Sequence, residues 1–240
     1  MKTFTGTGTD AGSYIDKPLV EHLRKRYELE FPEVISSVRI TKTLILRVLS
    51  MHKKVSGIRF MYGLADTLNP NSLRILLVPC THVSEHSIQA KPIIFSSGYY
   101  SHDGKLNSIK QVVELSANFV QFVESRMTGV VHKKITRGGF FGRSSLCDLM
   151  QDDRCFEVLF ALGLEHKDIK PILEPITMSD QSLSIYMDFA HLCPPSCNTG
   201  EDCVATMSVE LHAPVYDELD LYRHFRDNEL LKLNGGRALY

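Results

Sequence analysis

The chain resembles itself weakly at a distance of 100 residues. When residues 40–64 are aligned with residues 140–164, five of the 25 positions are identical: Leu46/Leu146, Leu49/Leu149, Phe60/Phe160, Gly63/Gly163 and Leu64/Leu164. Chance supplies about one or two identities in such a window, and repeats are judged by register more than by identity. The matches fall on the expected core side of a helix and of the strand that follows it. Any two helix–strand units share this apolar rhythm, but the common register favours a duplication.

A duplication predicts the fold class and the organisation of the chain. We expect an α+β protein with two tandem, similar units, each made of two helices and antiparallel strands, packed as a pseudo-dimer. The expected divisions are a flexible N-terminus at 1–11, a first repeat at 12–104, a second repeat at 105–198 and a helical C-terminal module at 199–240. A length of 240 residues accommodates this plan, because domains of 50–200 residues are common.

Periodicity and punctuation predict the individual elements. Helices are expected over residues 17–31, from 41 to a Ser-Gly break at 56–57, and over 108–127, 144–152 and 216–233. Strands are expected over residues 58–64, 73–78, 92–95, 156–164 and 182–189. The stretch 96–104 is interpreted as a loop, and the residues that end at the Gly138-Gly139 pair as a solvated linker.

Charge and hydropathy narrow the class of protein. The chain has 27 Lys and Arg against 28 Asp and Glu, a net charge of −1, which gives no electrostatic reason to expect nucleic acid or an anionic membrane as partner. No apolar run approaches the ~20 residues that a membrane helix needs, and the polar first 14 residues lack a signal-peptide core. We therefore expect a soluble, cytoplasmic protein.

The six cysteines fall into two groups. Cys80, Cys147 and Cys155 lie within apolar patterns and are expected to be small buried hydrophobes. Cys193, Cys197 and Cys203 instead crowd into a stretch of Pro, Ser, Asn, Thr and Gly.

The second group, with His191, offers nitrogen and sulfur ligands within thirteen residues. His191, Cys193, Cys197 and Cys203 are the ligands of a possible structural zinc site, because zinc binds four such groups tetrahedrally. A Cys193–Cys197 disulfide is the alternative in an exported protein. A proline-stiffened linker with free thiols is the favoured interpretation, which implies no cofactor.

Three further motifs carry less specific chemistry. The string from His82 to His86 matches H-x-x-E-H, but its place between two strands favours a loop over a metal-binding helix. Cys203 with Thr206 suggests a thiol nucleophile, although no orienting group or oxyanion hole can be assigned. The basic run 132–139 lacks the lysine spacing of a phosphate-binding loop.

The first unit resembles uncharacterised proteins common in Bacteroidetes. The resemblance is carried by VSGIRFMYGL, by RILLVPC and by the closing Cys-Pro-Pro-Ser-Cys of residues 193–197. It draws attention to Arg59, since the second unit has Leu159 at the corresponding position. Any role that Arg59 plays therefore belongs to the first unit alone.

The tail from residue 203 resembles the C-terminal module called the CFI-box. The matching residues are Cys203, Ala205, Thr206, Pro214, Arg223, Phe225, Arg226, Asp227, Leu230, Gly236 and Arg237. The tail departs from the pattern at Val204, where the box has Phe, and its Ile position is missing or shifted. Neither resemblance implies an activity.

These observations favour a non-enzymatic scaffold or protein-interaction protein with a protein partner. The candidate functional residues are Cys203, Thr206, Arg59, Arg226 and Asp227. The alternative is a thiol- or zinc-dependent activity centred on the Cys193, Cys197 and Cys203 cluster. We expect the tail to fold back on the body, which favours a monomer over a homodimer.

Overall fold

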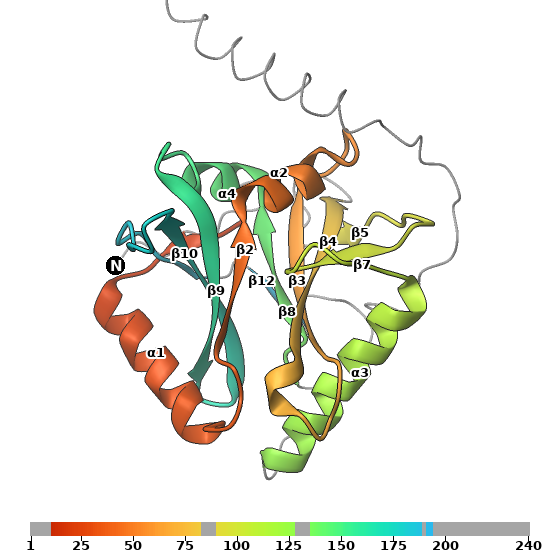
Figure 1. The fold of residues 1–240 in the computed structure, drawn as a ribbon, viewed down its shortest axis with the longest axis vertical. Helices are drawn as coiled ribbons and strands as arrows, with labels where there is room; N and C mark the ends of the chain where they lie inside the picture. The colour runs from red at the N-terminus through yellow and green to blue at the C-terminus, as the bar shows by residue number, and fades with distance from the viewer. Residues whose placement is uncertain (1–10, 83–89, 128–134, 189–190, 194–240) are drawn as a thin grey trace, which may run out of the picture.

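The computed structural model describes residues 11–82, 90–127, 135–188 and 191–193 (Figure 1). The chain combines helices with antiparallel sheets, so the predicted α+β class is confirmed. The α-helices are α1 (Lys17–Glu30), α2 (Lys42–Ser50), α3 (Ile109–Arg126) and α4 (Arg143–Leu149), and a 3-10 helix spans Pro70–Ser72. The predicted C-terminal helix lies outside the described residues.

The strands form two antiparallel sheets. Sheet A has the order β1-β11-β10-β9-β2, and sheet B has the order β12-β8-β3-β4-β6-β7 with β5 paired to β4. The bounds for sheet A are β1 (Ser13–Tyr14), β2 (Ser37–Thr41), β9 (Cys155–Glu165), β10 (Asp168–Thr177) and β11 (Met187–Asp188). Those for sheet B are β3 (Gly57–Leu64), β4 (Leu73–His82), β5 (Ala90–Pro92), β6 (Tyr99–Ser101), β7 (Leu106–Asn107), β8 (Gly138–Gly142) and β12 (His191–Cys193).

Each sheet takes elements from both halves of the sequence. In sheet A, β2 from the first half pairs with β9 from the second, and in sheet B, β8 from the second half pairs with β3 from the first. The outer helices follow the same exchange, because α1 packs on β9 and α3 packs on β3 (Figure 1). The two halves are therefore interlocked.

The main core lies between the sheets. Phe60 on β3 and Phe160 on β9 are completely buried, and their ring centroids are 5.5 Å apart. Phe141 on β8 meets Phe60 edge-on at 5.6 Å. Aromatic rings of alternate residues on strands from both sheets thus fill the interior, as the period-2 alternation of a strand requires.

Side-chain caps fix where the helices begin. Asp16 accepts a hydrogen bond from the Leu19 N–H at 3.1 Å, and Thr41 accepts one from the Leu44 N–H at 3.3 Å. Ser108 and Gln111 form a reciprocal capping box at the start of α3. Such caps satisfy N–H groups that have no partner inside the helix.

The sequence analysis missed several strands, the longest of which is β10 (Asp168–Thr177). Two of the missed strands, β2 and β8, are short and run straight into a helix. β2 continues into α2, and β8 continues into α4, with no turn residue between strand and helix. The Gly138-Gly139 pair, interpreted as the end of a linker, lies inside sheet B between β3 and β12. A Cβ atom at Gly138 would lie 2.3 Å from the Phe60 carbonyl oxygen, so the glycine permits close strand approach there.

Several smaller expectations need correction. Cys147 is exposed, because Leu146 and Leu149 take the buried side of α4, whereas Cys80 and Cys155 are buried as expected. The strand expected over 92–95 lies earlier, at Ala90–Pro92, and the loop expected over 96–104 contains β6. A strand was expected over 182–189, and of its described residues, 182–188, only Met187–Asp188 form a strand, with an isolated bridge at Ser182. Within the described residues, none of the helices combines the length and apolarity that a membrane crossing requires.

Candidate functional site

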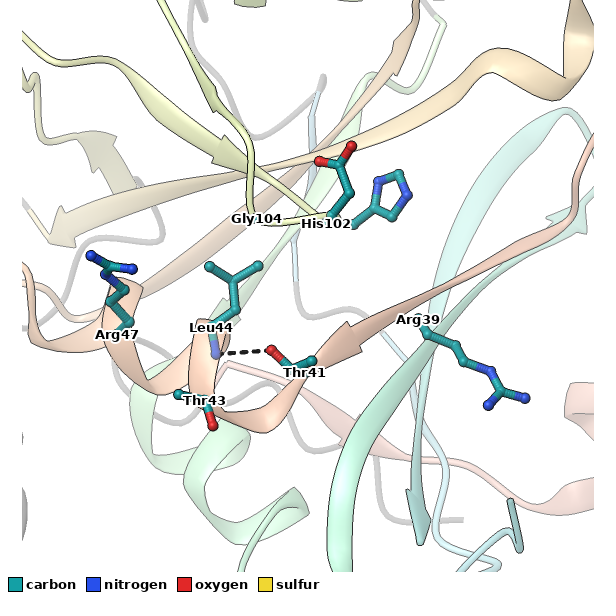
Figure 2. Close-up of a pocket in the computed structure, with 8 residues that line it drawn as sticks. Arg39, Thr41, Thr43, Leu44, Arg47, His102 and Gly104 are labelled. Carbon is teal, nitrogen blue, oxygen red and sulfur yellow. Dashed lines mark hydrogen bonds between the residues drawn. The ribbon is translucent and has the colours of Figure 1, made fainter. Parts of the chain in front are cut away.

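A surface pocket of about 410 Å³ opens between the first turns of α2 and the turn that joins β6 to β7 (Figure 2). One wall comes from β2 and α2, at the edge of sheet A, and the other comes from sheet B. The lining residues are Arg39, Thr41, Thr43, Leu44, Arg47, His102, Asp103 and Gly104. Because the two walls are about 60 residues apart in sequence, the pocket exists only once the two sheets have packed together.

The α2 wall combines hydroxyl groups with an apolar floor. The Thr41 hydroxyl is committed to the Leu44 N–H as the helix cap, while Thr43 is exposed on the first turn. Leu44 is only 8% exposed and belongs to the main core. The wall therefore offers hydrogen-bonding groups above a rigid base.

Two arginines bring positive charge to this wall. The Arg47 guanidinium lies over the Tyr100 ring, 5.1 Å from its centroid. Arg39 contacts Asp180 at 2.5 Å and Glu157 at 3.6 Å, and in Figure 2 its side chain extends away from the other lining residues. The hydrogen bond and the charge of Asp180 raise the pKa of Arg39, so this group stays cationic.

The opposite wall is built around His102. Its backbone N–H donates to the Ile75 carbonyl at 2.7 Å, and its Nδ1 accepts from the Ile75 N–H at 3.3 Å. Burial, assisted by the positive charge of Arg74, lowers the pKa of His102 although Asp103 opposes the shift. A neutral ring whose Nδ1 accepts a hydrogen bond carries its proton on Nε2, which is then a donor.

Asp103 is held in the same turn. Its carboxylate accepts from the Ser101 hydroxyl at 2.5 Å and from the Lys105 N–H at 3.3 Å. Desolvation raises the pKa of Asp103, but these hydrogen bonds outweigh it, and the net shift is downward. Gly104 follows with φ of +79°, a left-handed conformation that favours glycine. The turn is thus ordered by its own hydrogen bonds.

Arg59, a predicted functional residue, lies elsewhere. It is 4% exposed on β3, where it faces Val78 of β4 and Phe140 of β8 in the sheet register. Burial raises the pKa of Tyr99, the charge of Cys80 adds to this, and the charge of Arg59 opposes it. Arg59 is therefore part of a buried cluster on the outer side of sheet B and does not line the pocket.

The other predicted site residues are placed only in part. His191 and Cys193 lie in β12, opposite Phe140 and Gly138 of β8. Cys197, Cys203, Thr206, Arg226 and Asp227 lie outside the described residues. Across the portion of the chain that the structure describes, no three His, Cys, Asp or Glu side chains are grouped closely enough to hold a metal ion. His82 ends β4, and the rest of the H-x-x-E-H string is not described.

The sequence analysis did not identify any of the pocket residues. The alternation in Ser-Val-Arg-Ile-Thr, residues 37–41, was the available signal for a strand that leads to a capped helix. No local pattern connects that strand to His102. No family model, curated protein or solved structure matches this chain.

Proposed function

We propose that this protein is a non-enzymatic protein-interaction protein that binds its partner at the pocket between α2 and the β6–β7 turn. The observation that carries the proposal is the pocket's composition: two arginines, the Asp103 carboxylate, a neutral imidazole and an exposed hydroxyl group above an apolar floor. These groups carry both signs of charge and form hydrogen bonds, which suits recognition of a polar surface.

We further propose that the body arose by internal duplication. The similar surroundings of two glycines support this proposal. A Cβ atom at Gly63 would lie 2.9 Å from the Leu115 Cβ, and a Cβ atom at Gly163 would lie 2.9 Å from the Leu23 Cβ. In each case an outer helix packs directly on a strand of the other half of the chain. The burial of Phe60 and Phe160 in one core is the second support.

The number of residues between corresponding positions in the two halves is one larger for the helices α2 and α4 than for the strands β3 and β9. The buried residues of α2 are Leu44, Ile45, Val48 and Leu49, and those that follow the start of α4 are Ser145, Leu146, Leu149 and Met150. This pattern matches at a spacing of 101, whereas the strands β3 and β9 match at 100. Duplication with a one-residue change in the connection accounts for both spacings.

A crosslinking experiment tests the interaction proposal. A photoreactive amino acid is introduced at Thr43, on the pocket wall, and at Lys25, an exposed residue of α1 that serves as control. We expect a discrete crosslinked partner at Thr43 and none at Lys25. Adding Arg47→Glu to the Thr43 variant is expected to abolish that product, and the purified partner is expected to bind Arg47→Glu at least about 10-fold more weakly.

Two results would contradict the proposal. The first is an identical set of crosslinked products at Thr43 and Lys25, which would indicate non-specific contact. The second is a partner captured at Thr43 whose affinity for the Arg47→Glu protein equals its affinity for the wild type.

A further inference from the structure

The imidazole ring of His102 completes the ladder between β4 and β6 at the point where the backbone of β6 turns away. Leu76 of β4 lies opposite Ser101, the last residue of β6, so the next pair in this antiparallel register is Ile75 with His102. The His102 N–H donates to the Ile75 carbonyl at 2.7 Å, as a ladder pair requires. The Ile75 N–H, however, donates to Nδ1 of the His102 ring at 3.3 Å. A side-chain nitrogen therefore accepts the bond that a backbone carbonyl ordinarily accepts.

This acceptor exists only while the ring is neutral. A neutral imidazole has one nitrogen that accepts a hydrogen bond, whereas in an imidazolium both nitrogens carry a proton and donate. Protonation of His102 would therefore set two donors, Nδ1–H and the Ile75 N–H, against each other. Ile75 is completely buried, so its N–H has no access to water while the turn stays in place, and a buried donor without an acceptor is costly. The protonated ring is incompatible with the bonded arrangement.

The segment held by these two bonds is the β6–β7 turn, residues 102–105, and it is joined to itself by other bonds. The Asp103 carboxylate accepts from the Ser101 hydroxyl and from the Lys105 N–H. The Asn107 side-chain amide donates to the Ser101 hydroxyl at 3.0 Å and to the Lys105 carbonyl at 2.9 Å. Because these bonds do not involve β4, the turn can move away from β4 without losing its own structure.

The same turn forms one wall of the pocket. His102, Asp103 and Gly104 belong to the pocket lining, and His102 and Gly104 lie across from Thr43 and Arg47 of α2 (Figure 2). A movement of the turn away from β4 therefore changes the shape of the pocket.

We propose that His102 is a pH-sensitive switch for this pocket. With a neutral ring the β6–β7 turn is docked on β4 and the pocket is formed, and protonation of the ring releases the turn. The inference rests on the proposed interaction function in one respect, because release of the turn also weakens binding of the partner at the pocket. Protonation of histidine is an established way of biasing an element between two arrangements.

The charged groups around the ring act in both directions. Burial is the largest influence and lowers the pKa of His102, the charge of Arg74 on β4 lowers it further, and the charge of Asp103 on the turn raises it. The pKa of Asp103 is itself lowered, so this carboxylate keeps its charge while His102 titrates. Other charged or titratable groups on the elements around the pocket are Arg47 and Tyr100, the ion-paired Arg39, Glu157 and Asp180, and Lys105.

The direction of the switch follows from which form binds the proton more tightly. The docked ring has a pKa below the ordinary value of 6.5, so the proton prefers the released form. The docked fraction is largest above a pH of about 6.5 and falls as the pH drops toward the pKa of the docked ring. Within this interval, the ratio of released to docked protein rises by up to about 10-fold per pH unit, and below it the ratio stays constant.

Amide hydrogen exchange in the full-length protein, followed by NMR between about pH 8 and pH 5, tests the switch. Protection compares the exchange rate of each amide with that of an unstructured chain at the same pH. We expect the Ile75 and His102 N–H groups to lose protection together below about pH 6.5, by up to about 10-fold per pH unit. The Leu76 N–H is the internal control, because Leu76 pairs with Met61 and successive backbone groups face opposite sides of a strand. Its protection is expected to stay constant.

Variants identify the group that binds the proton. His102→Asn keeps an acceptor oxygen near the position of Nδ1 but cannot be protonated, so both amides are expected to stay protected at every pH. His102→Ala has no acceptor, and both amides are expected to be unprotected at every pH. His52→Asn is the matched control, because Nδ1 of His52 also accepts a backbone N–H, from Lys54 at 3.1 Å, but in an exposed loop. It is expected to behave as the wild type. The wild type and His102→Asn decide the inference if the Ala variant does not fold.

Three results would overturn the switch. The first is constant protection of the Ile75 N–H across this pH range in the wild type. The second is loss of protection at Ile75 with none at His102, which would mean that the ring rotates while the turn stays docked. The third is the same pH dependence in His102→Asn, which would assign the proton to another group.

Crosslinking from Thr43 at about pH 7.5 and pH 5.5 separates this inference from the function on which it rests. We expect the partner product to be at least about 5-fold weaker at the lower pH, and to be unchanged in the His102→Asn background. If Thr43 captures no specific partner while the amides respond as expected, the interaction function is wrong and the switch stands. If the partner is captured equally at both values while the amides lose protection, the interaction function stands and control of binding by the switch is wrong.

Discussion

The strands β2 and β8 occupy similar places in the two sheets, but their outer edges differ. Both strands lie beside a long central strand and run into a short helix. At β8 the outer edge is paired with β12, and glycines at 138, 139 and 142 let the backbones approach closely. At β2 the sequence Ser-Val-Arg-Ile-Thr places polar side chains beside the pocket. The edge that is built into a sheet contains three glycines, and the edge that ends a sheet carries the polar side chains of Arg39 and Thr41.

The helix starts differ in the same way. Thr41 caps α2 with its own hydroxyl, whereas Gly142 precedes α4 without a side-chain cap and the N–H of Arg143, the first residue of α4, donates to the Ser56 carbonyl. The start of α4 is therefore satisfied by distant backbone, and the start of α2 by its own capping side chain.

The largest expected effect concerns the hydrophobic core between the two sheets. Phe60→Ala and Phe160→Ala should each lower the free energy of unfolding by about 3–5 kcal/mol, because each removes a fully buried ring from the core between the sheets. Since the rings are 5.5 Å apart, the double variant should lose less than the sum of the single losses. Chemical denaturation measures all three values. Losses under about 1 kcal/mol at both sites would show that neither ring supports the core.

The sequence predicted the parts of this fold whose signals are local. The helices α1, α2 and α3 were found because apolar residues recur at helical spacing, and β3, β4 and β9 were found because each is a run of apolar residues. The internal similarity also placed Phe60 and Phe160 in the core. The sequence places these residues correctly because they are buried, and buried positions recur periodically as apolar residues.

The missed strand β10 pairs with its chain neighbour β9, so distance along the chain does not explain that miss. Other missed elements depend on distant partners. β2 and β8 are short, and their pairing joins residues such as Val38 and Phe160 that are more than 100 positions apart. Glycine in β8 predicts a chain break when read locally, although in the sheet it permits close packing. The pocket was missed for the same reason, because Thr43 and His102 approach one another only through the packing of two sheets.

A second prediction compares the two outer helices. Gly63→Ala and Gly163→Ala should each lower the free energy of unfolding by about 1–3 kcal/mol, because the new methyl group would overlap the Cβ of Leu115 or Leu23. Thermal and chemical unfolding of the two variants give the comparison. A loss at one glycine with none at the other would show that the helices do not pack equivalently, and would weaken the duplication proposal.

The third prediction separates the two helix starts. Thr41→Ala should lower the free energy of unfolding by about 1 kcal/mol, because the Leu44 N–H loses its acceptor, while Thr41→Ser should retain most of the stability. Denaturation curves of the two variants provide the test. Equal stability of the Ala and Ser variants would mean that the Thr41 hydroxyl does not stabilise the start of α2.

The smallest expected effect is a pH dependence of stability that comes from His102 in the pocket wall. Burial lowers the pKa of His102 in the folded state below its ordinary value of 6.5, so the unfolded chain binds this proton more readily. Stability should therefore fall as the pH drops below about 6.5 and should stop falling, for this group, once the pH lies below the folded-state pKa. The charge of Asp103 opposes this pKa shift, and the charge of Arg74 favours it. The pKa of Asp103 is itself lowered, so the stability that Asp103 contributes is lost only at a pH below the ordinary value of 3.8. In His102→Gln, unfolding measured between pH 7 and pH 5 should show a shallower decline than in the wild type. An unchanged slope would mean that the ring is equally hydrated in both states, and that the wall of the pocket is less ordered than its hydrogen bonds to Ile75 indicate.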